Sequence, residues 1–70
     1  MTNNKIAPIE KIDSDAYRKS EFFERNQDIW RLRFVEEWSI LKISKHFSLE
    51  ISEVKKIIDI HRAFYKQEYD

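Results

Sequence analysis

Four lysines stand close together in the second half of the sequence, namely Lys42, Lys45, Lys55 and Lys56. Residues 39–62 contain five cationic side chains and three carboxylates, which gives this stretch a net charge of +2. Residues 1–24 have a net charge of −1, and the whole chain is formally neutral. Lysine ammonium groups bind phosphate as point charges. The spacing therefore indicates a weakly basic surface that suits a polyanion, while the neutral total charge opposes such a partner.

The other chemically versatile side chains are sparse. His46 and His61 are the only histidines, and neither lies at metal-ligand spacing from a carboxylate and a second histidine. His61 follows Val54 by seven residues on a stripe predicted to face inward, so we expect it to be half-buried and hydrogen-bonded. Cysteine and glycine are absent, which excludes thiolate metal sites and glycine-rich phosphate loops. With no nucleophile–base grouping either, the sequence predicts no enzyme, no metal site and no cofactor.

The composition favours an all-α domain. Glycine is absent, proline occurs once and charged residues make up 37% of the 70 residues, so hairpin turns between strands have no suitable sequence. Apolar residues recur at spacings of three and four, which predicts a compact bundle of about four helices. No apolar run reaches the roughly 20 residues of a membrane span, and no signal peptide is evident at the N-terminus. We therefore expect one cytoplasmic domain over residues 13–70, preceded by a loosely ordered arm over residues 1–12 that packs on the core or on a partner.

The first half of the domain is predicted to form two helices. The first begins at Asp13 or Ser14, either of which can cap a helix, and ends around Arg25. Asn26 is then predicted to cap the second helix, over residues 27–37. The aromatic side chains of this second helix recur at i, i+4 and i+8 and are predicted to lie in the core: Trp30, Phe34 and Trp38. Stacking on nucleotides is the alternative role for these rings.

The second half of the domain is predicted to form two helices joined by a tight turn. Ser39 is predicted to cap a helix over residues 40–47, and a longer helix runs from about Glu50 to Lys66 or Gln67. Helices so closely connected must cross steeply and bury their apolar faces together, as in a helix-turn-helix. The long helix has apolar residues on more than one face. Its C-terminal half is therefore predicted to pack on the first helix, on a second copy of the chain, or on both.

The turn and its flanks carry a recognisable motif, Ile43-Ser44-x-x-Phe47-Ser48-Leu49-x-x-Ser52-Glu53-Val54-x-x-Ile57-Ile58. It resembles the helix-turn-helix consensus of bacterial and phage DNA-binding proteins, and residues 29–62 are similar to region 4 of the sigma-70 family. The resemblance implies a DNA-binding transcriptional regulator of phage or mobile-element type that acts as a homodimer. It places one set of residues on the outward face of the recognition helix: Glu50, Ile51, Ser52, Lys55, Lys56 and Asp59. By the same resemblance Ser52 and Lys56 would meet base edges, and Lys42, Lys45 and Lys55 would bind phosphates.

The sequence departs from the consensus at two points, and the second of them leaves another function open. Ser48 stands where the family has a glycine in the left-handed conformation, and Glu50 with Ile51 forms an acidic and apolar leading edge. That edge suits a protein-interaction module that binds RNA polymerase, a sigma factor or another regulator. A homodimer would use Phe64, Tyr65 and the N-terminal aromatic residues, which are Tyr17, Phe22 and Phe23.

Overall fold

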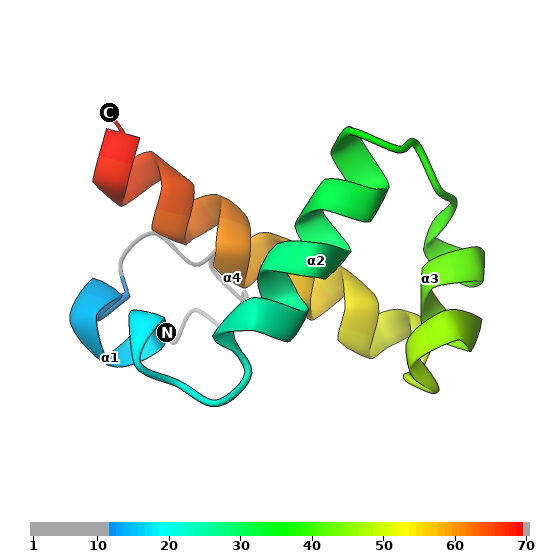
Figure 1. Cartoon of the computed structure of the whole chain (residues 1–70), viewed down its shortest axis with the longest axis horizontal. Coiled ribbons are helices and arrows are strands. Elements are labelled where there is room, and N and C mark those ends of the chain that lie inside the picture. The colour runs from blue at the N-terminus through cyan, green and yellow to red at the C-terminus, as the bar shows by residue number, and fades with distance from the viewer. Residues whose placement is uncertain (1–11, 70) are drawn as a thin grey trace, which may run out of the picture.

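The computed structural model describes residues 12–69 and confirms the all-α fold class. Its elements are four helices: α1 (Ser14–Arg18), α2 (Phe23–Phe34), α3 (Ile40–Phe47) and α4 (Ile51–Tyr69) (Figure 1). No strand occurs among the described residues. The predicted N-terminal arm lies, apart from Ile12, outside them. Within residues 12–69, no helix is both long and apolar enough to cross a membrane.

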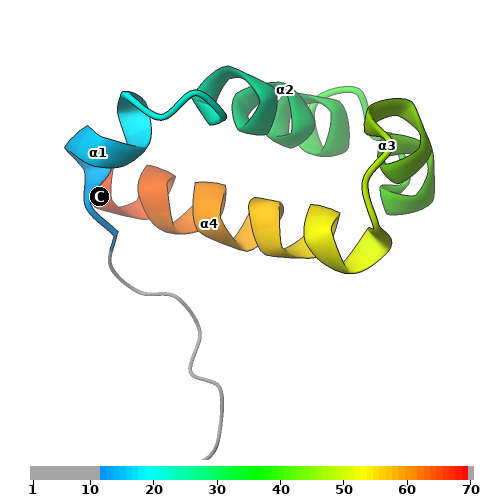
Figure 2. The same ribbon diagram turned by 90° about the horizontal axis from the view of Figure 1, so that it is seen from below.

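Helix α4 is the element on which the other three pack. It runs along the length of the domain, with α1, α2 and α3 arranged along one side of it (Figure 2). The buried core lies between α2, α3 and α4 and consists of Ile29, Leu32, Ile43, Val54, Ile57 and Ile58. Burying one such aliphatic side chain contributes about 1.5–3 kcal/mol. This layer therefore fixes how α3 and the first half of α4 sit against α2.

Two of the predicted N-caps are confirmed. The Oδ1 of Asp13 accepts a hydrogen bond from the backbone N–H of Ala16 over 3.2 Å, so Asp13, and not Ser14, caps α1. The Oγ of Ser39 accepts from the N–H of Lys42 over 3.0 Å at the start of α3. Each cap satisfies an N–H group that the helix itself leaves unpaired.

The predicted boundary between the first two helices is wrong. Helix α1 ends at Arg18 and α2 begins at Phe23, so Asn26 lies inside α2 and is no cap. A turn at Ser20 separates the helices, because its carbonyl accepts from the N–H of Phe23 and its Oγ from the N–H of Phe22. Asn26 is buried and bonded to Tyr17, so its side chain serves a tertiary contact in place of a cap.

Helix α2 also ends earlier than predicted, at Phe34 and not at Glu37. Glu37 has a left-handed φ of 62°, and the N–H of Trp38 closes the end by donating to the carbonyl of Leu32 over 2.9 Å. Because α2 stops at Phe34, Trp38 does not continue the helical stripe of Trp30 and Phe34, whose ring centres lie 4.4 Å apart. Trp30 and Trp38 pack against the core as expected, whereas Phe34 is 47% exposed and is not a core residue.

Candidate nucleic-acid interface

The turn between α3 and α4 has the geometry predicted from the motif. Ser48 lies in the left-handed region with φ 57° and ψ 44°. The N–H of Leu49 donates to the carbonyl of Ser44 over 2.9 Å, and the N–H of Ser48 donates to Lys45 over 3.4 Å. These two bonds satisfy carbonyls at the end of α3 and reverse the chain within residues 48–50. A non-glycine residue in this conformation costs about 1 kcal/mol.

The inner side of α4 is fixed by close packing. Val54, Ile57 and Ile58 are at most 5% exposed, and Leu49 packs against the same cluster beneath the turn. Ser44 is buried where α3 meets α4, where a small side chain allows the two helices to approach closely. Since these residues hold one side of α4 against the domain, the opposite side must face outward.

The outward side of α4 contains the residues that the motif placed there. The structure leaves all six exposed at the start of the helix: Glu50, Ile51, Ser52, Lys55, Lys56 and Asp59. Lys42 and Lys45 are exposed on α3. We refer to these eight residues as the α3–α4 face. It combines four ammonium groups with two carboxylates, one hydroxyl and one apolar side chain.

Some charged side chains of this face already interact with other side chains of the domain, and others do not. Asp59 is paired with Arg62 over 2.9 Å, and the Nζ of Lys42 lies 4.1 Å above the Trp38 ring in a cation–π contact. Among residues 12–69, the side chains of Lys45, Lys55 and Lys56 form no ion pair. Their charge is therefore available to an external anion.

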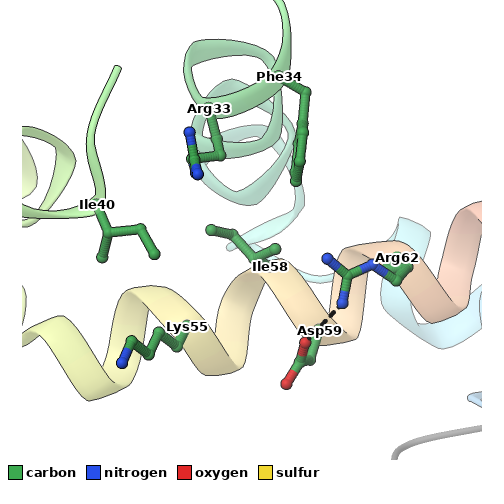
Figure 3. A pocket seen from close by; sticks show the side chains of 7 residues that line it. All are labelled: Arg33, Phe34, Ile40, Lys55, Ile58, Asp59 and Arg62. Carbon is green, nitrogen blue, oxygen red and sulfur yellow. Dashed lines mark hydrogen bonds and ion pairs between the residues drawn. The ribbon is translucent and has the colours of Figure 1, made fainter. Parts of the chain in front are cut away.

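A groove of about 380 Å³ lies beside this face, between the end of α2, the start of α3 and the middle of α4 (Figure 3). Its lining consists of Arg33, Phe34, Ile40, Lys55, Ile58, Asp59 and Arg62. Arg33 and Phe34 point from α2 toward Ile58 on α4 (Figure 3). The sequence analysis included Lys55 and Asp59 among the site residues but missed the contribution of α2. No local pattern could have revealed it, because the groove exists only where two distant segments meet.

A buried polar network lies under the other end of α4. The Arg25 guanidinium donates to Asn26 Oδ1 over 3.0–3.1 Å, and Asn26 Nδ2 lies 3.2 Å from the Tyr17 hydroxyl. That hydroxyl lies 2.6 Å from His61 Nδ1. Since the Nδ2 of Asn26 can only donate, the Tyr17 hydroxyl accepts from Asn26 and uses its own proton to donate to His61 Nδ1. This order places the proton of the neutral imidazole on Nε2.

His61 is more deeply buried than predicted. Its side chain is 0% exposed, and among the described residues Nε2 has no hydrogen-bond partner. The centre of its ring lies 4.9–5.7 Å from the ring centres of five aromatic residues: Tyr17, Phe23, Trp30, Phe64 and Tyr65. Burial lowers the pKa of His61, because the imidazolium form loses its hydration. Burial also raises the pKa of Tyr17, against the opposing effects of the Asn26 hydrogen bond and the Arg25 charge.

The aromatic residues that were predicted to form a homodimer interface differ in their exposure to solvent. Phe64 is 4% exposed and packs inside the chain beside Tyr17 and Phe23. Tyr65 is half-buried, whereas Phe22 is 49% exposed. Phe64 is therefore not available to a partner, and Phe22 is the most accessible of the N-terminal aromatic residues.

Comparisons of the chain with protein-family models, with curated proteins and with solved structures found no match. The resemblance to helix-turn-helix regulators and to sigma-70 region 4 therefore stays a prediction that depends on the residues of the motif.

Proposed function

We propose that this protein is a small helix-turn-helix DNA-binding transcriptional regulator of phage or mobile-element type. The observation that carries the proposal is the start of α4, where one side is fixed in the core and the other presents Ser52, Lys55 and Lys56 to solvent. The exposed residues of this stretch lie between Ile51 and Asp59, which are about 12 Å apart along the helix axis. An α-helix with its side chains is about 10–12 Å in diameter, which fits the major groove of B-DNA, about 12 Å wide.

The residues of the α3–α4 face suit distinct parts of a DNA duplex. Lys42, Lys45 and Lys55 would neutralise phosphates and set the register of the protein. Ser52 and Lys56 would reach base edges, with lysine directed to the acceptors of guanine. Glu50 can accept from a cytosine amino group, and Ile51 can contact a thymine methyl group. A homodimer would read two half-sites about one helical turn apart.

Fluorescence anisotropy with a labelled duplex, measured over a range of salt concentrations, tests the proposal. Binding must be strongest at low ionic strength and must weaken with a linear dependence of log K on log salt. Lys55→Ala and Lys56→Ala should each weaken binding, and loss of a phosphate contact should reduce the salt slope by about 1. Lys19→Ala is the matched control, since Lys19 is an exposed lysine beside α1. Absence of salt-dependent binding to any duplex at low ionic strength contradicts the proposal.

A second candidate function is a protein-interaction module that docks on RNA polymerase, a sigma factor or another regulator. It is favoured by the leading edge of α4, where Ile51 is 42% exposed beside the exposed Glu50, and by the neutral total charge. Under this alternative Ile51→Asp abolishes capture of the partner, whereas Lys55→Ala leaves it intact. The opposite ranking of the two variants favours DNA.

A further inference from the structure

The groove beside the α3–α4 face combines an apolar floor with cationic walls. Ile58 and Ile40 lie at its base, and Phe34 leaves 47% of its surface exposed on one side (Figure 3). Arg33 donates to the carbonyl of Trp38 over 3.3 Å, and its guanidinium lies 5.6 Å from the Phe34 ring centre. It forms no ion pair among residues 12–69. Lys55 adds a second cation, whereas Arg62 is paired with Asp59. The groove therefore has a net charge of +2 around an accessible aromatic ring.

The corner between α1 and α2 has the opposite character. Phe22 is 49% exposed there, between the exposed carboxylates of Glu21 and Glu24. The Arg25 guanidinium lies 4.6 Å from the Phe22 ring centre and covers part of it. We call residues 21–24 the acidic corner. It lies at the start of α2, whereas Arg33 and Phe34 of the groove lie at the end of the same helix.

We propose that the groove binds the acidic corner of a second copy of this chain. The corner offers an exposed aromatic ring beside two carboxylates, with Arg25 against part of the ring. The groove offers an apolar floor beside two cations without an ion pair among residues 12–69, so the two surfaces are complementary in polarity and in charge. The chain is neutral overall, so long-range repulsion does not oppose association of two copies. A small anionic ligand fits less well, because Lys55 and Arg62 are exposed and would leave it largely in water.

The proposed contact joins two different surfaces of the chain. Two copies can form it reciprocally and close into a dimer, or they can form it head to tail. The proposal does not depend on DNA binding, but Lys55 and Asp59 belong both to the groove and to the α3–α4 face. Self-association is therefore measured without DNA, so that its failure and the failure of DNA binding are distinguishable.

Sedimentation velocity over a concentration series up to about 1 mM gives the dissociation constant of the self-association. Phe22→Ser and Phe34→Ser should each weaken it about tenfold or more, as expected for aromatic residues at the centre of a contact. Leu41→Ser is the control, because Leu41 is 51% exposed on α3 and belongs to neither surface. Circular dichroism confirms that each variant is folded. A wild-type chain that stays monomeric throughout the series, or variants that associate like the wild type, would overturn the proposal.

A charge-reversal experiment tests the same contact without removing apolar surface. Glu21→Lys places a cation on the corner, and Lys55→Glu places an anion in the groove, so each variant alone should associate more weakly than the wild type. When the two variants are mixed, the altered corner meets the altered groove and the unaltered corner meets the unaltered groove. The mixture should therefore associate more strongly than either variant alone. A mixture that associates no better than its components rules out pairing of the corner with the groove.

Discussion

Replacing Tyr17 by phenylalanine tests whether the buried network holds α1, α2 and α4 together. The Tyr17 ring packs edge-on against Phe23 and Phe64, with 5.3 Å between ring centres in each pair, and phenylalanine keeps those contacts. The hydroxyl is lost, and with it the acceptor for Asn26 Nδ2 and the donor to His61 Nδ1. Asn26 is 5% exposed and His61 is 0% exposed, so water reaches neither freely.

The expected loss in the free energy of unfolding comes from Asn26 Nδ2 and His61 Nδ1, which both lose a hydrogen-bond partner. A buried polar group left without a partner costs about 1–3 kcal/mol. Part of this cost is recovered because phenylalanine has no hydroxyl to desolvate, so we expect Tyr17→Phe to lower the free energy of unfolding by about 2–3 kcal/mol. A domain of this size has a total stability of roughly 4–10 kcal/mol. The variant should therefore remain folded but should unfold at a clearly lower urea concentration.

Urea unfolding followed by far-UV circular dichroism gives the required free energies. The urea midpoint should fall by roughly 2–3 M at unchanged slope, taking a slope of about 1 kcal/mol per M for a small domain. Tyr65→Phe is the matched control, because Tyr65 is half-buried and its hydroxyl forms no hydrogen bond among residues 12–69. We expect a change within about 0.5 kcal/mol for this control. Equal effects of the two variants would refute a stabilising role for the network.

Three further predictions concern the same fold. Folding lowers the pKa of His61, so between about pH 6.5 and the pKa in the folded state the unfolded chain binds more protons than the folded chain. The free energy of unfolding should therefore fall as the pH is lowered through that range. Urea midpoints at a series of pH values test this prediction, and His61→Gln should remove this pH dependence. Ser48→Gly should raise stability by about 0.5–1 kcal/mol, since glycine adopts the left-handed conformation without strain, whereas an unchanged urea midpoint would argue against strain at the turn. Ser39→Ala should lower stability by about 1 kcal/mol through loss of the α3 cap, with Ser52→Ala as an exposed control inside α4.

The sequence predicted best those features that depend on neighbouring residues. The start of α3 depends on a bond from Ser39 to an N–H only three residues away, and its predicted bounds are confirmed. The left-handed turn at Ser48 depends on bonds to residues of the preceding turn. Helix α4 begins at Ile51, within one residue of its predicted start, and continues to Tyr69. Such short-range contacts can be predicted from the order of the residues alone.

The features that the sequence did not predict depend on distant partners. Asn26 has the chemistry of a cap, but it bonds to Tyr17 nine residues away, and Tyr17 in turn bonds to His61 across 44 residues. This network gives Asn26 a tertiary contact inside α2, and the residues near Asn26 in the sequence do not indicate it. The groove is a second example, since Arg33 and Arg62 come together only after α2 and α4 have packed. Local pattern therefore identified the α3–α4 face but not the groove beside it.

Helix α4 is one continuous helix, so the residues of the α3–α4 face in its N-terminal half and His61 of the buried network in its C-terminal half belong to the same rigid element. Lys56 and His61 are separated by about 7.5 Å along the axis, and Ile57 and Ile58 between them are buried in the core. A defect at His61 should therefore unfold the domain as a unit and should not reorient Lys56 within a folded molecule. It follows that Tyr17→Phe, measured well below its unfolding midpoint, should bind a DNA duplex like the wild type, whereas Lys56→Ala should lose affinity at full stability. If Tyr17→Phe weakens binding while the chain remains fully folded, the two halves of α4 are coupled by a local rearrangement, and the rigid-helix argument fails.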